Sequence, residues 1–184
     1  MPEYDWVWRA KSFERVERPG VKASSAGASW SVLMGERDFA WGYCIELPDD
    51  ARAHLMWHTR IDVLAAGDGM SPGLAFHDSE EGVLFQVNAA LGVAELRRLR
   101  VNNRTERIEL FSIARIECPY AISLTYNALT GECAGMVGDD RIFDRTLPWG
   151  SIPALPAVTS VEIVTTVSTD PGSAEYGNLT LKCE

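Results

Sequence analysis

The sequence predicts an all-β protein, a two-sheet antiparallel β-sandwich of the jelly-roll kind that spans residues 1–184 as a single domain. Apolar and polar residues alternate with a period of two along most of the chain, as in half-buried strands. Turn residues recur about every ten positions, which is typical of antiparallel sandwiches and barrels. Helical periodicity is poor, and a chain of 184 residues has the usual length of one domain.

The clearest strand begins at Leu55. One face of this segment holds Leu55, Trp57, Thr59, Ile61 and Val63. The opposite face holds His54, Met56, His58, Arg60 and Asp62. The first set predicts a buried face and the second a polar one. The glycines and proline of 67–69 and 71–73 then predict turns.

Further strands follow in the same pattern. We expect them at 74–76, 83–87, 94–101, 107–116, 121–126, 133–137, 158–168 and 177–183. Turns are predicted between several of them, at 78–82, 127–131, 138–140 and 170–172. The stretch 91–99 also has apolar residues at helical spacing, but Val101 and the flanking glycines favour a strand.

Composition excludes several classes of protein. The net charge of −9 argues against a duplex-DNA binder, because phosphate binding needs a basic patch. The longest uncharged stretch, 146–161, contains three prolines, so no membrane-spanning helix is predicted. Charges throughout the first thirty residues leave no room for a signal-peptide core. We therefore expect a soluble protein that does not associate with membranes, cytoplasmic as written and extracytoplasmic if a signal peptide has been removed.

Four cysteines are present, Cys44, Cys118, Cys133 and Cys183. No two of them have the C-x-x-C spacing of a zinc or thioredoxin-type site. Without a secretion signal, free buried thiols are expected.

Three segments resemble the concanavalin A-like jelly rolls of the laminin-G type. The hairpin 120–131, with its Tyr126-Asn127 strand end and Thr130-Gly131 turn, is similar to a hairpin that recurs in those domains. Segments 73–87 and 174–181 resemble their central hairpin and closing strand. The resemblance implies that the first and last strands pair in one sheet, with Trp6 and Trp8 beside Leu179 and Leu181.

This fold resemblance implies carbohydrate recognition by one sheet face and its loops. Sugar sites combine flat aromatic faces with polar side chains. The candidate polar ligands, which we expect on one set of faces, are His58, Arg60, His77, Gln86 and Asn88. Trp149 is the candidate stacking platform, because it lies in a loop, whereas Trp57 and the four earlier tryptophans are expected to pack in the core.

Two other functions stay open. A glycan-degrading lyase on this fold would use His58 or His77 as base, Arg60 to neutralise charge, and Gln86 and Asn88 to orient the sugar. A hydrolase would need two carboxylates flanking the bond, but the spacing of Glu106 and Glu109 predicts opposite faces of a strand. A protein-interaction module would instead show an exposed apolar patch.

Calcium is a further expectation, since many jelly rolls of this type bind it. Ca²⁺ prefers oxygen ligands, and the predicted turns offer Asp68 and Asp78. No EF-hand spacing occurs in the chain.

Overall fold

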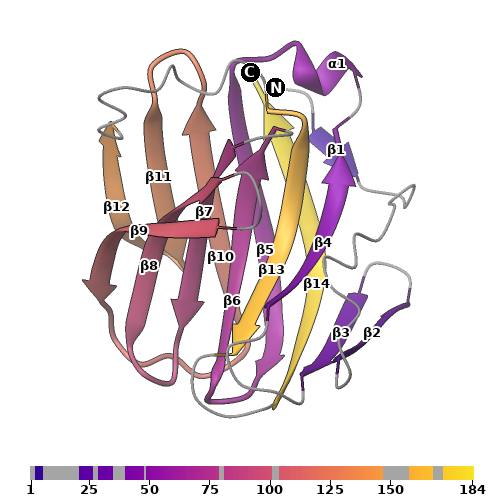
Figure 1. The fold of residues 1–184 in the computed structure, drawn as a ribbon, viewed down its shortest axis with the longest axis vertical. Helices are drawn as coiled ribbons and strands as arrows, with labels where there is room; N and C mark the ends of the chain where they lie inside the picture. The colour runs from indigo at the N-terminus through magenta and orange to yellow at the C-terminus, as the bar shows by residue number, and fades with distance from the viewer. Residues whose placement is uncertain are drawn as a thin grey trace.

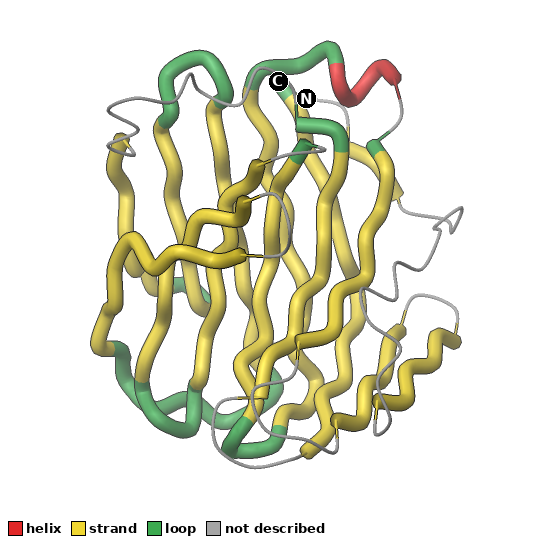
Figure 2. Tube along the Cα trace, in the orientation of Figure 1, coloured by secondary structure: helices red, strands yellow, loops and turns green. Residues whose placement is uncertain are grey.

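The structure is a computed structural model that describes residues 3–5, 21–26, 29–34, 40–47, 49–78, 81–100, 104–146, 158–167 and 172–184. Two antiparallel sheets face each other in a sandwich (Figure 1). Turns connect the strands at both ends, and the only helix of the described residues is the single turn α1 (Asp49–Arg52) (Figure 2). No described helix is long and apolar enough to cross a membrane.

The larger sheet has eight strands. Its order is β12 (Asp140–Thr146), β11 (Glu132–Val137), β10 (Tyr120–Asn127), β5 (Met56–Ala66), β14 (Gly172–Cys183), β3 (Ser29–Met34) and β2 (Val21–Ala26). The eighth strand, β1 (Glu3–Asp5), pairs with the far end of β14, at residues 180–182. The first and last strands therefore share a sheet, as predicted, while Trp6 and Trp8 lie outside the described residues.

The smaller sheet has six strands. Its order is β4 (Ala40–Glu46), β13 (Ser160–Val167), β6 (Met70–His77), β7 (Glu81–Asn88), β8 (Val93–Arg100) and β9 (Arg104–Ser112). Strands β6 to β9 are consecutive hairpins, whereas β13 returns from the other sheet to lie between β4 and β6.

The core lies between the two sheets because each strand turns its alternate apolar residues inward. In β5, Trp57, Ile61 and Val63 are fully buried, and so are Phe76 in β6 and Phe85 in β7. Strand β6 contacts β5, β10 and β14 across the interface. The period-two pattern and the core position of Trp57 are thus confirmed. Leu55 differs from the prediction, since it precedes the strand and is 49% exposed.

Several strand boundaries differ from the sequence prediction. Residues 71–73 belong to β6 rather than to a turn. Pro72 is tolerated there because β6 pairs with β7 only from Gly73 onward. The strand expected over 107–116 ends at Ser112. Strands β2, β3, β4 and β12 were not predicted, and β12 is an edge strand in which Phe143 alone is buried.

A β-bulge bends the β9 edge of the smaller sheet. The register between β8 and β9 shifts between Leu96 and Arg97, and one extra residue in a strand increases its local twist. Figure 1 shows β9 running across the view rather than along the other strands. The bulge also places Glu106 and Glu109 opposite Arg98 and Leu96, two positions of one face of β8, so their predicted opposite orientation is wrong.

Candidate functional site

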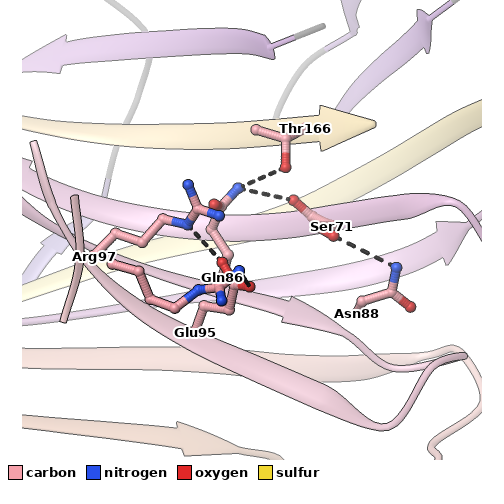
Figure 3. A network of polar contacts seen from close by, with 7 residues as sticks. Ser71, Gln86, Asn88, Glu95, Arg97 and Thr166 are labelled. Atoms are coloured by element: carbon pink, nitrogen blue, oxygen red, sulfur yellow. Dashed lines mark hydrogen bonds and ion pairs between the residues drawn. The ribbon is translucent and has the colours of Figure 1, made fainter. Parts of the chain in front are cut away.

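The outward face of the six-stranded sheet carries a polar network that spans five strands (Figure 3). We call it the outer polar network. Its members are Ser71, Gln86, Asn88, Glu95, Arg97, Arg107 and Thr166. All seven occupy the register positions that alternate with core residues such as Phe85 and Leu96.

A carboxylate between two arginines forms the exposed part of this network. Glu95 Oε2 accepts a bond from Arg97 Nε at 2.6 Å, and Glu95 Oε1 accepts one from Arg107 Nη2 at 2.8 Å. Arg97 and Arg107 are directly opposite in the β8–β9 ladder, where like charges repel. Glu95 offsets that repulsion and holds both guanidinium groups in a defined orientation.

Exposure separates these three residues from the buried Gln86 and Asn88 of the network. The Arg107 side chain is 52% exposed, Arg97 27% and Glu95 19%. A guanidinium has five N–H donors in a fixed plane, and an ionised carboxylate is an acceptor only. The group therefore offers oriented donors and acceptors to solvent with one excess positive charge.

Gln86 anchors the inner part of the network. Its Nε2 donates to Ser71 O at 3.3 Å and to Thr166 Oγ1 at 3.0 Å. The side chain crosses Gly73, its ladder partner, because that position has no Cβ. A Cβ there would lie 2.8 Å from Gln86 Cγ and 2.6 Å from Phe85 O.

Asn88 fixes two turns at the end of the same face. Its Nδ2 donates to Asp68 O at 3.2 Å, and its Oδ1 accepts from Leu91 N at 2.9 Å. Gln86 and Asn88 are 4% and 3% exposed. Both were predicted as ligand residues, and the structure instead gives them buried roles that support the strands carrying Glu95 and Arg97.

His77 lies on the same outward face, next to a buried carboxylate. Its Nε2 is 3.2 Å from Glu162 Oε2 on β13, and its Nδ1 is 2.9 Å from Asp78 O. Glu162 is 1% exposed. Both ring nitrogens of His77 thus contact protein groups, so the imidazole positions β6 against β13.

His58 and Arg60 lie on the opposite side of the molecule. They are on β5 of the eight-stranded sheet, alternating with the core residues Trp57 and Ile61. The prediction that they share a set of faces with His77, Gln86 and Asn88 is wrong, because β5 and β6 belong to different sheets. The chain reverses at 67–69 and crosses between layers, which period-two alternation does not reveal.

The surroundings of His58 disfavour the protonated form of its imidazole. Its Nδ1 is 2.7 Å from Thr125 Oγ1. Burial lowers the pKa of His58 below its usual 6.5, and the charges of Lys182 and Arg60 lower it further. Arg60 Nη2 lies 3.6 Å from Asp62 Oδ1. This face therefore carries a neutral imidazole at pH 7.

The two aspartates predicted as calcium ligands are far apart. Asp68 precedes β6 and Asp78 follows it, so roughly 25 Å of strand separates them and they do not share one ion. Asp78 Oδ1 accepts a bond from Glu81 N at 2.7 Å. In the described part of the chain, no three His, Cys, Asp or Glu side chains form a metal-binding group. Trp149 lies outside the described residues.

The sequence analysis missed Glu95, Arg97 and Arg107. Glu95 and Arg97 have the i, i+2 spacing that places two side chains on one strand face, and this was an available signal. Arg107 joins them only through the bulged register of β9, which the sequence pattern does not specify.

Comparisons with known proteins support the fold. No family model matches the chain, and no curated protein matches it. A protein of unknown function with a galectin-like fold from Bacillus subtilis superposes with a TM-score of 0.63 at 8% identity, covering 89% of this chain and 86% of that one. A functionally unknown protein from Saccharomyces cerevisiae gives 0.55 at 10% identity, covering 89% and 92%.

A third similar structure is the CBM2 module of the evolved Dit protein of Lactobacillus casei BL23 phage J-1. It superposes with a TM-score of 0.52 at 10% identity, covering 87% of this chain and 77% of that one. The chain has a lectin-like β-sandwich fold. At these identities the comparisons establish the fold alone.

Proposed function

We propose that the protein binds carbohydrate on the outward face of its six-stranded sheet, through Glu95, Arg97 and Arg107. The observation that carries the proposal is the Glu95 carboxylate held between the two guanidinium groups, at 2.6 and 2.8 Å. Sugar hydroxyls both donate and accept hydrogen bonds. A fixed set of charged donors and an acceptor suits neighbouring hydroxyls, because charge-assisted bonds are strong and directional.

The position and charge of Glu95, Arg97 and Arg107 indicate which class of glycan they would bind. They lie at the bent β8–β9 edge, where all three side chains are part-exposed. With two arginines and one glutamate, the group favours neutral or acidic glycans over basic ones. The similarity to a protein with a galectin-like fold and to a CBM2 module is consistent with this proposal.

Three expectations from the sequence also belong to this proposal. Kinship with concanavalin A-like jelly rolls is supported by the pairing of β1 with β14. A stacking role for Trp149 and a calcium ion near Asp68 are also proposed. Asp68 is exposed, and its carbonyl oxygen accepts a bond from Asn88, so an ion there would act on the turn that borders the outer polar network.

A glycan array tests the proposal, run with calcium and then with a chelator. Arg107→Ala and Arg97→Ala are compared with Arg60→Ala, a half-exposed arginine on the opposite face. We expect binding to weaken at least about tenfold in the first two variants, which is about 1.4 kcal/mol, and to stay unchanged in the third. Equal loss in all three, or loss only in Arg60→Ala, would place the site elsewhere.

Glycan cleavage receives less support than binding. Both ring nitrogens of His77 contact protein groups, and His58 lies on the opposite face with its Nδ1 against Thr125. A bound glycan recovered intact after long incubation supports binding alone, whereas shortened products would favour the enzyme.

A further inference from the structure

A cavity of about 440 Å³ lies at one end of the sandwich. Its wall combines the β5–β6 turn, the β7–β8 turn and the irregular segment 113–119, at the lower end of the molecule in Figure 2. None of the seven residues of the outer polar network is among its described lining residues. Small-molecule sites have volumes of roughly 300–1,000 Å³, so the cavity is large enough for a compact ligand.

Backbone hydrogen bonds hold the cavity wall in place. Ile116 N donates to Ala89 O at 3.4 Å, and Ile113 N donates to Gly92 O at 2.9 Å. These bonds fasten the segment after β9 to the β7–β8 turn. On the other side, Gly67 N donates to Ser173 O at 2.9 Å. The cavity is therefore preformed, as most small-molecule sites are.

Apolar side chains form much of the wall. Ala66, Met70, Ala89 and Ile116 all line the cavity, and Met70 and Ala89 are 1% and 7% exposed. Methionine adapts its shape to irregular ligands. This part of the wall suits an apolar molecular body.

Tyr120 supplies a buried polar group beside the apolar part of the wall. The residue is 7% exposed, and its Oη has no hydrogen-bond partner among the described residues. Tyr176 on β14 also faces the core, but its hydroxyl bonds to Thr165 Oγ1. A buried hydroxyl without a partner is costly, so a ligand oxygen that accepts from Tyr120 would relieve that cost.

The chemistry around Tyr120 favours an uncharged ligand. Burial raises the pKa of Tyr120, and the neighbouring Cys118 raises it further. Burial also raises the pKa of the Cys118 thiol. Both groups therefore remain neutral at pH 7, and Tyr120 Oη remains a donor. The exposed residues Asp68, Arg115 and Glu117 at the cavity carry one excess negative charge, which disfavours an anion.

We propose that this end cavity binds an uncharged small molecule whose apolar body packs against Met70, Ala89 and Ile116 and whose oxygen accepts a hydrogen bond from Tyr120 Oη. The site is separate from Glu95, Arg97 and Arg107, although Asn88 of the outer polar network bonds to Asp68 in the cavity wall. The ligand class is a compact ketone, ester or ether.

Two probes of the same shape test this proposal on the full chain. Acetophenone has a carbonyl oxygen where α-methylstyrene has a CH₂ group. Amide and methyl NMR shifts are followed as each probe is titrated. We expect both probes to shift Ala66, Met70 and Ile116, with acetophenone binding several-fold more tightly. In Tyr120→Phe the difference between the probes should disappear, and the unfolding midpoint without probe should stay the same or rise.

A filling variant and a control locate the site. Ala90→Phe places a ring in the cavity wall and should abolish binding of both probes, while Ala53→Phe, at an exposed alanine after α1, should leave binding unchanged. Absence of shifts at the cavity residues would overturn the proposal, as would equal affinity for the two probes in the unmodified protein. That comparison needs no variant to fold, and either result leaves the glycan proposal unaffected.

Discussion

Gly73 determines how Gln86 crosses the smaller sheet. We predict that Gly73→Ala destabilises the protein by about 1–3 kcal/mol, because its Cβ would displace Gln86 and break the bonds to Ser71 and Thr166. Urea denaturation measures the change. Gly67→Ala is the matched control, since its Cβ would meet nothing closer than Met70 Cγ at 3.5 Å. Equal effects of the two substitutions would show that Gln86 does not need this space.

The His58 imidazole should titrate with a midpoint below pH 6.5. Burial and the charges of Lys182 and Arg60 lower its pKa, and an NMR titration of the imidazole measures the midpoint. We expect Lys182→Met to raise that midpoint and Arg141→Met, at a distant exposed position on β12, to leave it unchanged. A midpoint at or above 6.5 in the unmodified protein would contradict this account.

The lowered pKa of His58 also affects the stability of the protein. Because the folded pKa is lower than the unfolded one, the unfolded chain binds more protons between the two values. The free energy of unfolding should therefore fall as the pH drops through 6.5, and His58→Gln should remove part of that decrease. Thermal midpoints measured between pH 7.5 and 5.0 compare the two proteins.

At the scale of elements, an aromatic cluster joins the sheets where β9 faces β12. Phe143 packs edge-on to Phe85 at 5.2 Å and stacks on Phe111 at 5.3 Å between ring centroids. Arg145 lies over the Phe111 ring and also pairs with Glu109. One side of the sandwich is thus closed by ring packing and an ion pair.

Phe143→Ala should destabilise the protein by about 3–5 kcal/mol, as expected for removing a buried ring. Chemical denaturation measures the loss. Leu129→Ala, at a side chain that is 71% exposed, should change the free energy by less than about 0.5 kcal/mol. A loss below about 1 kcal/mol for Phe143→Ala would show that β12 contributes little to closing this edge.

The strands differ in how well the sequence pattern predicts them. Strands with one clean apolar face, such as β5 and β10, were predicted because burial of that face enforces period-two alternation. Strand β12 was missed because an edge strand buries little, and its charged residues conceal Phe143. The β9 bulge was missed because an extra residue changes the register without changing composition.

At the scale of the whole molecule, the two-sheet architecture was predictable and the candidate site was only partly so. His77, Gln86 and Asn88 were placed on neighbouring strands correctly, since consecutive hairpins keep neighbours together. His58 and Arg60 were misplaced because the assignment of a strand to one sheet or the other depends on contacts distant in sequence. Arg107 depends on the bulged register as well.

We propose that glycan recognition occurs at the outward face of the six-stranded sheet. Amide chemical-shift mapping with the tightest glycan from the array tests it most directly. We predict that the shifts concentrate at residues 95–97 and 107–110 and are absent at residues 58–62 on the opposite face. Shifts centred on residues 58–62 instead would contradict the account and assign binding to the eight-stranded sheet.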